Sequence, residues 1–144
     1  MTAATPRILL VTAAIIPLNG RMFIAQRPPG KKFGLLWEFP GGKVELGETL
    51  QESLQREINE ELCWDVHVGD LFRHIHHPYF DFSVELYAFW CTVCTGELCL
   101  REHIAYHWAS PEELRSFSFT AADRELVSLL EKSPPPLLFQ SGEL

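Results

Sequence analysis

The residues best suited to chemistry lie in an acidic segment, residues 42–61. It holds six carboxylates against two bases, and the carboxylates are Glu45, Glu48, Glu52, Glu57, Glu60 and Glu61. Like charges at this density repel one another unless a cation lies among them. Carboxylate oxygens without histidine or cysteine partners are the ligands that Mg²⁺ and Mn²⁺ prefer. The segment therefore indicates a divalent cation site at which phosphate oxygens serve as further ligands.

The spacing brings three of these glutamates together on one helix. A capping box, Thr49-Leu50-Gln51-Glu52, predicts a helix that starts at Thr49 and continues to Leu62. At about 100° per residue, its apolar stripe consists of Leu50, Leu54, Ile58 and Leu62. The glutamates at the edge of that stripe, three or four positions apart, are Glu57, Glu60 and Glu61. An ordinary amphipathic helix with a solvated acidic face has the same charge, so charge alone does not separate the two interpretations.

The order of residues resembles the Nudix box, GX5EX7REUXEEXGU, in which U is aliphatic. The first glycine and every charged position match, at Gly42, Glu48, Arg56, Glu57, Glu60 and Glu61, and Ile58 stands at the first aliphatic position. Cys63 replaces the second glycine, and Trp64 replaces a smaller aliphatic residue. A glycine at position 63 would end the helix with positive φ, which costs another residue about 1 kcal/mol. Neither departure removes a chemical group, so we expect activity to survive.

Further segments resemble the Nudix branch that contains MutT and the cytidine triphosphate pyrophosphohydrolases. They are residues 25–28, 36–45 and 108–113, so the resemblance covers nearly the whole chain. It implies a Nudix fold of the α/β (α+β) class, with a mixed β-sheet sandwiched between α-helices. It also implies hydrolysis of a nucleoside triphosphate to the monophosphate and pyrophosphate, with Mg²⁺ as cofactor and Mn²⁺ as an alternative ion.

The resemblance also implies roles for individual residues. The implied metal ligands are the carbonyl group of Gly41 and the carboxylates of Glu57, Glu60, Glu61 and Glu102. Glu48 and Arg56 are implied to form an orienting ion pair. The implied catalytic set is Glu57, Glu61, Glu102, Glu48 and Arg56. Glu57 is the first choice for the general base and Glu102 is the second. A carboxylate that acts as a general base must not be fully committed to metal. Arg27 and Lys43 match positions that contact phosphate or sugar, although each alone is typical of a surface cation.

Base recognition rests on Asp123 and on the aromatic residues Tyr79 and Phe80, with Phe82 nearby. Asp123 matches a position at which relatives directed at oxidised guanine carry asparagine. An ionised carboxylate only accepts hydrogen bonds, which suits the exocyclic amine of cytosine and also the donor groups of an oxidised guanine. Cytidine-type nucleotides are favoured, with 8-oxo-guanine nucleotides as the alternative. Asp123 is also the fourth residue of a capping box that begins at Thr120, and the aromatic residues also suit a core.

A strand-rich fold must position these side chains. Residues 7–16 and 21–26 predict a hairpin around Asn19-Gly20, and residues 66–75 and 82–93 have strand character. Helices are predicted after Ser110 and after Thr120, the second ending before Pro134. We expect a single domain over residues 1–133 and a proline-rich tail over residues 134–144.

The composition narrows the function classes. With 144 residues and 47% hydrophobic content, one core is expected. The formal net charge of −7 argues against nucleic-acid polymers and acidic membranes as partners, which leaves a small nucleotide. No apolar run approaches the roughly 20 residues that span a bilayer, and the cysteines need not pair, so a cytoplasmic location is expected. The oligomeric state is left as monomer or homodimer. A non-catalytic nucleotide-binding module, the rival class, is marked by loss of box glutamates, and all are present.

Two other groups of metal-binding residue types are weaker candidates. Cys91 and Cys94 form a CxxC, but on a strand they face opposite sides, and no second pair follows. His74 and His76 share a strand face without a carboxylate or cysteine that completes a ligand set. His103 and His107 are four residues apart. We expect structural cysteines and half-exposed histidines here.

Overall fold

The computed structural model describes residues 7–132, so the tail predicted at residues 134–144 lies outside the described residues. The strands are β1 (Arg7–Ile15), β2 (Pro17–Leu18), β3 (Arg21–Gln26), β4 (Trp37–Glu38), β5 (Gly41–Lys43), β6 (Asp65–Pro78), β7 (Phe82–Thr95) and β8 (Ala105–Ala109). The helices are α1 (Leu50–Leu62), α2 (Pro111–Leu114) and α3 (Ala121–Lys132). None of these helices is long and apolar enough to cross a membrane.

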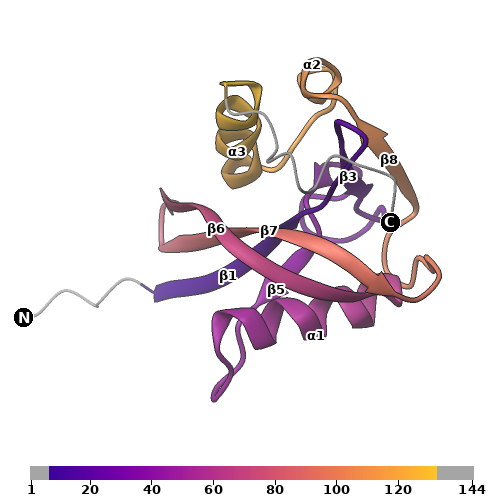
Figure 1. Ribbon diagram of the computed structural model, residues 1–144. Coiled ribbons are helices and arrows are strands. Elements are labelled where there is room, and N and C mark those ends of the chain that lie inside the picture. Colours follow the sequence, from indigo (N-terminus) through magenta and orange to yellow (C-terminus); the bar gives the residue numbers. More distant parts are fainter. Residues whose placement is uncertain (1–6, 133–144) are drawn as a thin grey trace, which may run out of the picture.

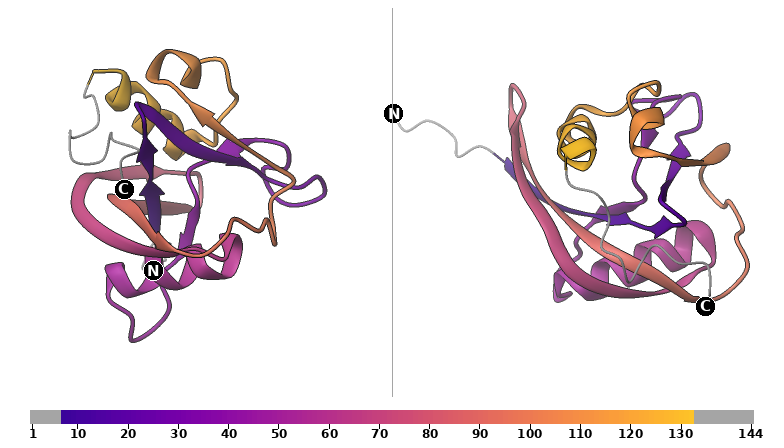
Figure 2. Two further views of the ribbon diagram at one scale, coloured as in Figure 1. Left: turned by 45° about the vertical axis from the view of Figure 1, so that its right-hand side comes forward. Right: turned by 45° about the horizontal axis from the view of Figure 1, so that its top comes forward.

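The strands form two sheets, and the larger is mixed. Its strand order is β5-β1-β7-β6, with β1 parallel to β7 and the other pairs antiparallel. In the second sheet, β3 pairs with β2, β4 and β8. The larger sheet lies between α1 on one face and α3 on the other (Figures 1 and 2). This confirms the predicted fold, a mixed sheet sandwiched between helices.

The core lies on both faces of the larger sheet because side chains alternate along its strands. On β7, Leu86, Ala88 and Trp90 belong to the cluster that also contains α3 residues. Phe89 and Cys91 point to the opposite face, where they join the apolar residues of α1. Cys91 is buried and Cys94 is exposed, as the strand geometry predicts.

The predicted hairpin at Asn19-Gly20 is correct only at its tip. Leu18 pairs with Arg21 and Pro17 with Met22, which joins β2 to β3. The prediction that residues 7–16 form the first hairpin strand is wrong, because β1 belongs to the other sheet. It pairs with β7 from Arg7↔Phe82 to Ile15↔Trp90. The chain therefore changes sheet at Ile16.

Helix α1 starts and ends as its sequence signals require. The capping box forms, since the Thr49 side chain accepts from the Glu52 backbone and the Glu52 side chain accepts from the Thr49 backbone. Cys63, which stands at the position of the second glycine of the box, adopts the left-handed conformation at φ 64° that a glycine would adopt. Trp64 is buried against Phe23, with ring centroids 5.0 Å apart. The helix thus keeps the ending of the Nudix box without its glycine.

The remaining elements match their predictions, with one correction. Strands β6 and β7 form as predicted but are longer, and Ser110 caps α2 with a capping box. Helix α3 also forms, yet Asp123 does not cap the backbone of Thr120. The N–H of Thr120 donates to the Trp37 carbonyl group at 3.3 Å, and Asp123 accepts instead from the N–H of Phe39 at 2.9 Å. Asp123 therefore ties α3 to the segment that leads into β5.

Candidate functional site

The three glutamates of α1 lie in different environments. The side chain of Glu61 is 4% exposed, that of Glu57 is 18% exposed and that of Glu60 is 56% exposed. Glu57 and Glu61 therefore lie at the edge of the core, and Glu60 reaches solvent. An added Cβ at Gly42 would lie 2.5 Å from the carboxyl group of Glu57, so any other residue would displace this carboxyl group from the backbone.

Gly41 is fixed by its own strand pairing. It adopts φ 156° opposite Ala13, and a Cβ there would lie 2.0 Å from the Thr12 carbonyl oxygen. Both glycines therefore allow β5 to pass tightly between β1 and α1. This packing brings the backbone of Gly42 beside the carboxylate of Glu57.

Arg56 holds the acidic groups in position. Its guanidinium donates to both oxygens of Glu48, at 2.5 and 3.0 Å, and to Glu57 at 2.9 Å. It also donates to Glu60 at 3.2 Å and to the carbonyl group of Lys43 at 3.2 Å. The hydrogen bond from Arg56 lowers the pKa of Glu48 to about 2. Glu48 therefore stays ionised, and one arginine connects α1, β5 and the loop that follows β5.

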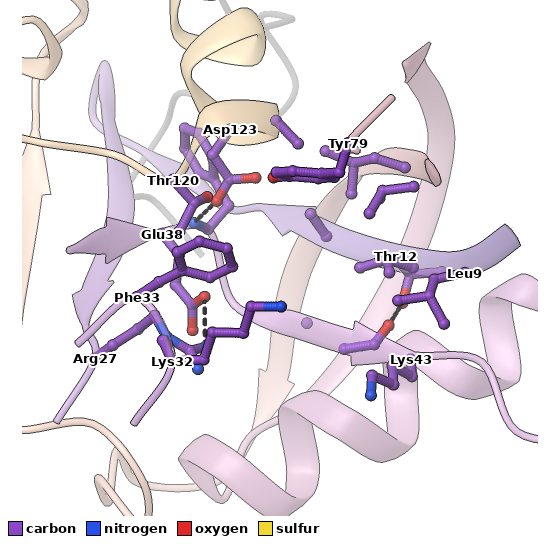
Figure 3. Close-up of a pocket in the computed structure, with 18 of the residues that line it drawn as sticks. Leu9, Thr12, Arg27, Lys32, Phe33, Glu38, Lys43, Tyr79, Thr120 and Asp123 are labelled. Atoms are coloured by element: carbon purple, nitrogen blue, oxygen red, sulfur yellow. Dashed lines mark hydrogen bonds and ion pairs between the residues drawn. The ribbon is translucent and has the colours of Figure 1, made fainter. Parts of the chain in front are cut away.

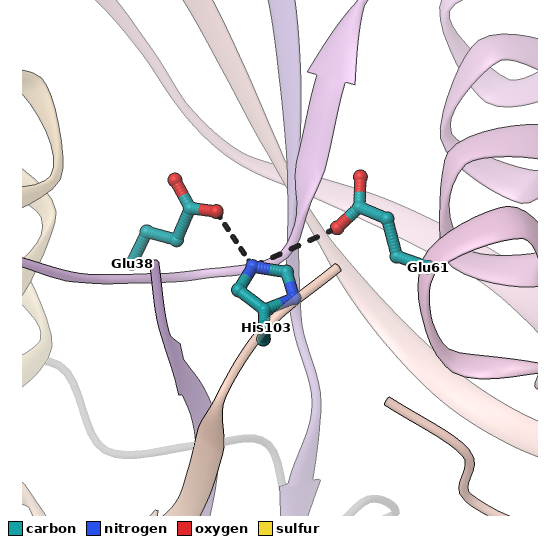
Figure 4. A group of neighbouring side chains, drawn as sticks. All are labelled: Glu38, Glu61 and His103. Carbon is teal, nitrogen blue, oxygen red and sulfur yellow. Dashed lines mark hydrogen bonds and ion pairs between the residues drawn. The ribbon is translucent and has the colours of Figure 1, made fainter. Parts of the chain in front are cut away.

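Glu61 belongs to a buried group that the sequence did not reveal. Nε2 of His103 is 2.7 Å from Oε2 of Glu38 and 4.0 Å from Oε1 of Glu61 (Figure 4). Burial, next a hydrogen bond with Glu57, and then the charges of Glu38, Glu57 and Glu102 raise the pKa of Glu61 to about 11. Oε1 of Glu61 is buried and has no hydrogen-bond partner among the described residues. An unpaired oxygen among several carboxylates is a place that a divalent cation fits.

Glu102 is exposed at the side of this group. It lines a pocket of about 240 Å³ together with Arg27, Pro28, Lys31, Glu38, Arg101 and His103. The N–H of Arg101, the residue before Glu102, donates to the carbonyl oxygen of Glu61 at 3.0 Å. The structure thus brings the loop before β8 to the C-terminal end of α1.

A larger cavity of about 370 Å³ opens beside β5 (Figure 3). Four of the five residues predicted to bind substrate line it, namely Arg27, Lys43, Tyr79 and Asp123. Phe80 does not, because its side chain is fully exposed in the turn between β6 and β7. The sequence analysis missed Lys32 and Phe33, which also line the cavity. Both lie in a loop whose conformation no strand or helix pattern predicts.

The cavity has an apolar, aromatic wall and a charged wall. Tyr79 stacks on Phe82 with ring centroids 4.7 Å apart, and the ring of Phe33 lies 6.5 Å from that of Tyr79. Nζ of Lys32 lies 5.0 Å from the centre of the Phe82 ring. On the charged wall, Arg27 pairs with Glu38 at 3.1 Å. The aromatic side suits a flat ring, and the charged side connects to the acidic group around Glu61.

Asp123 lies in the cavity wall with an altered acidity. Burial, and next the charge of Glu38, raise the pKa of Asp123 to about 8. The sequence argument took this carboxylate as ionised, whereas its neutral form dominates below about pH 8. A neutral carboxyl group donates one hydrogen bond and still accepts others. In Figure 3 the carboxyl group of Asp123 and the ring of Tyr79 point toward each other.

The strand histidines His74 and His76 both contact one carboxylate, that of Glu85. Nε2 of His74 lies 2.7 Å from Oε1 of Glu85, and Nδ1 of His76 contacts the other oxygen of Glu85. These contacts lower the pKa of Glu85, with His76 the larger cause. The group lies on the exposed outer part of β6 and β7, away from the two cavities.

Comparisons with known proteins identify related chains. A family model described as the NUDIX domain matches residues 11–129. A CTP pyrophosphohydrolase from Escherichia coli K12 is 36% identical over 84% of this chain and 90% of its own. An 8-oxo-dGTP diphosphatase from Buchnera aphidicola subsp. Schizaphis graminum is 32% identical over 85% of this chain and 92% of its own. The solution structure of the E. coli ORF135 protein superimposes with a TM-score of 0.77 at 34% identity, over 88% of this chain and 91% of that one.

Proposed function

The chain belongs to the Nudix family of hydrolases, and on this premise we propose that it converts cytidine-type nucleoside triphosphates and water into the monophosphate and pyrophosphate. Nudix enzymes act on small nucleotides and generally need a divalent metal ion. The observation that carries the proposal is the approach of the Glu57 carboxyl group to the backbone of Gly42. Gly41 and Gly42 also line the cavity, which is large enough for a nucleobase.

Mg²⁺ is the proposed cofactor, with Mn²⁺ as an alternative. The proposed ligands are the Gly41 carbonyl oxygen and the carboxylates of Glu57, Glu60, Glu61 and Glu102. The unpaired buried oxygen of Glu61 supports this set, since an oxygen that accepts no hydrogen bond is available to a cation. When bound, such an ion neutralises phosphate charge and lowers the pKa of a water molecule.

The chain's own residues supply positioning and proton transfer. We assign Glu57 as the general base and Glu102 as the second candidate for that role. Glu48 holds Arg56, and Arg56 in turn holds one oxygen of Glu57, so the base approaches the substrate from a fixed direction. Fixed geometry matters here because phosphoryl transfer depends mainly on positioning and on charge neutralisation.

The cavity fits the two ends of a nucleotide. We assign the aromatic wall of Tyr79, with Phe33 and Phe82, to the base, and Arg27 and Lys43 to the phosphates or sugar. A neutral Asp123 presents a donor and an acceptor side by side, which complements the N3 acceptor and N4 donor of cytosine. The similarity to a CTP pyrophosphohydrolase supports the same base.

Sanitation of 8-oxo-guanine nucleotides is the second candidate. Several relatives carry the name 8-oxo-dGTP diphosphatase, at 32% identity over 92% of one and 37% identity over 80% of another. A carboxyl group that both donates and accepts is also compatible with an oxidised guanine. The identity of the base therefore needs a direct comparison.

A substrate comparison with and without Asp123 tests the proposal. We expect the parent to release pyrophosphate faster from CTP and dCTP than from 8-oxo-dGTP, as measured by kcat/KM with chromatographic identification of the products. In Asp123→Ala, which has neither the donor nor the acceptor, the ratio of the two kcat/KM values should change at least about tenfold, equivalent to about 1.4 kcal/mol. Identical ratios in both proteins would remove Asp123 from base recognition, and a parent preference for 8-oxo-dGTP would favour the second candidate.

The net charge and the cysteines of the protein bear on its partners and its location. The net charge of −7 supports a small-molecule substrate and opposes nucleic-acid polymers and acidic membranes as partners. All four cysteines are free, which supports a reducing, cytoplasmic location. We propose a monomer or a homodimer.

A further inference from the structure

The buried group of Glu38, Glu61 and His103 has a composition that differs from that of the helix glutamates. Glu38 comes from β4, Glu61 from α1 and His103 from the segment before β8. Each offers one ligand atom, and these atoms all lie within 4.8 Å of one another. Glu38 and His103 are not part of the ligand set proposed above for Mg²⁺. Their nitrogen and oxygen atoms therefore need a separate explanation.

The spacing of the three ligand atoms resembles that around a single ion. Nε2 of His103 is 2.7 Å from Oε2 of Glu38 and 4.0 Å from Oε1 of Glu61. Ligands that bind one ion at about 2.1 Å lie about 3.0 to 3.4 Å from one another in octahedral or tetrahedral geometry. The 2.7 Å contact between His103 and Glu38 is a hydrogen bond that an ion would replace, and the 4.0 Å distance would have to shorten, so side-chain rotations are needed to bring the three atoms onto one centre.

Hydrogen bonds within the protein leave this group incompletely satisfied. Oε1 of Glu61 and Nδ1 of His103 are buried, and neither has a hydrogen-bond partner among residues 7–132. Arg27 already occupies the outer oxygen, Oε1, of Glu38 at 3.1 Å. Oε2 of Glu38 and Oε1 of Glu61 thus face one imidazole in a dry place, and the Glu61 oxygen has no partner among the described residues. A cation among the three atoms would take the place of the missing donor.

We propose that Glu38, Glu61 and His103 bind a second divalent cation, one of transition-metal type such as Mn²⁺, Co²⁺ or Zn²⁺. The imidazole gives the selectivity, because nitrogen ligands suit these ions and Mg²⁺ prefers an all-oxygen shell. Glu61 also belongs to the proposed Mg²⁺ ligand set, so the inference rests on the proposed function through this shared residue. Glu38 and His103 distinguish the second position from the first.

An ion at this position has a route to solvent and to substrate. Glu38 and His103 both line the pocket of about 240 Å³, and Glu38 also lines the larger cavity. The ion would therefore lie between the two pockets. Arg27, Lys31 and Arg101 surround the smaller one, and their charges attract a polyphosphate whose oxygens would complete the coordination.

Cobalt binding to the full chain tests the proposal without depending on activity. Co²⁺ gives visible absorption bands when nitrogen and oxygen ligands surround it, whereas Mg²⁺ is silent. We expect one equivalent of Co²⁺ to bind in the presence of excess Mg²⁺. The variants His103→Gln and Glu38→Gln should each weaken this binding at least about tenfold. His74→Gln, which changes an exposed histidine on β6, is the matched control and should bind Co²⁺ as the parent does.

Two results would overturn the proposal. One is displacement of all Co²⁺ by Mg²⁺; the other is equal Co²⁺ affinity in the parent and in His103→Gln. If His103→Gln does not fold, the ¹⁵N resonances of the histidine rings in the parent answer the question. Zn²⁺ should shift the His103 Nε2 resonance, and an unchanged resonance would contradict the site. Mg²⁺-dependent pyrophosphate release by the parent is measured separately, so its absence would refute the proposed function while leaving Co²⁺ binding at His103 intact.

Discussion

Arg56 is the residue on which most of the acidic groups depend for their position. Its planar fork reaches two oxygens of Glu48 and one oxygen of Glu57. Lysine carries the same charge but lacks the planar fork that holds both oxygens of Glu48 and one oxygen of Glu57 in fixed directions. We expect Arg56→Lys to lower kcat at least about tenfold, because Glu57 loses its fixed direction. Steady-state pyrophosphate release measures this. Arg21→Lys, in an exposed pair with Glu113, is the control and should be near normal. An unchanged kcat in Arg56→Lys would contradict the role of Arg56.

Asp123 makes the stability of the protein depend on pH. Its folded-state pKa, about 8, is above its ordinary value of 3.8, so between these values the folded protein holds a proton that the unfolded chain releases. The free energy of unfolding therefore falls as the pH rises through this window. Asp123→Asn has no such proton, and its amide oxygen can still accept from Phe39.

Urea unfolding at about pH 5 and pH 8, without divalent cations, measures this dependence. From pH 5 to pH 8, the free energy of unfolding of Asp123→Asn should rise relative to that of the parent by more than about 1.4 kcal/mol, the equivalent of one pKa unit. Asp81→Asn, an exposed change in the turn after β6, should follow the parent. A parallel pH dependence in Asp123→Asn and the parent would mean that Asp123 keeps an ordinary acidity.

Some site residues could be predicted from the sequence and others could not, for a physical reason. Glu57, Glu60 and Glu61 lie on one helix, so helical geometry relates them directly. The contact between Glu38 and His103 joins residues 65 positions apart, and no local period relates such residues. The adjacent pair Glu102-His103 was the only available signal, and only Glu102 had a matching position in the family.

At the scale of elements, the end of α1 carries a measurable strain. Cys63 has φ 64°, a conformation that costs a residue with a Cβ about 1 kcal/mol and that glycine adopts freely. We expect Cys63→Gly to raise the free energy of unfolding by roughly 0.5 to 1 kcal/mol. Cys63→Ala removes the same thiol but keeps the Cβ, so it should give no such gain. Chemical denaturation compares the two, and an equal effect of both changes would show that the backbone at Cys63 is unstrained.

The elements that were predicted well are those with local signals. Capping boxes at Thr49 and Ser110 contain donor and acceptor within four residues, so the sequence alone identifies each helix start. The Asn19-Gly20 turn is equally local. The partner of β1 is not, because Arg7 pairs with Phe82 across most of the chain. The hairpin signal therefore located the turn but not the sheet to which the preceding strand belongs.

At the scale of the whole molecule, the candidate site exists only because distant segments converge. Helix α1 supplies Glu57 and Glu61, β5 supplies the glycine backbone, and the loop before β8 supplies Glu102. The cavity for the base lies next to them and is closed by residues from α3 and from the β6–β7 hairpin. Cation binding and nucleotide docking are thus properties of the assembled fold.

The most direct test is Mg²⁺-dependent pyrophosphate release from CTP by the parent, by Glu57→Gln and by Glu52→Gln. Glu52→Gln is the matched control, because Glu52 lies on the same helix and glutamine also completes a capping box. The account predicts release that requires Mg²⁺, that persists in Glu52→Gln and that falls at least about 100-fold in folded Glu57→Gln. Release that proceeds without a divalent cation, or that is unchanged in Glu57→Gln, would contradict it.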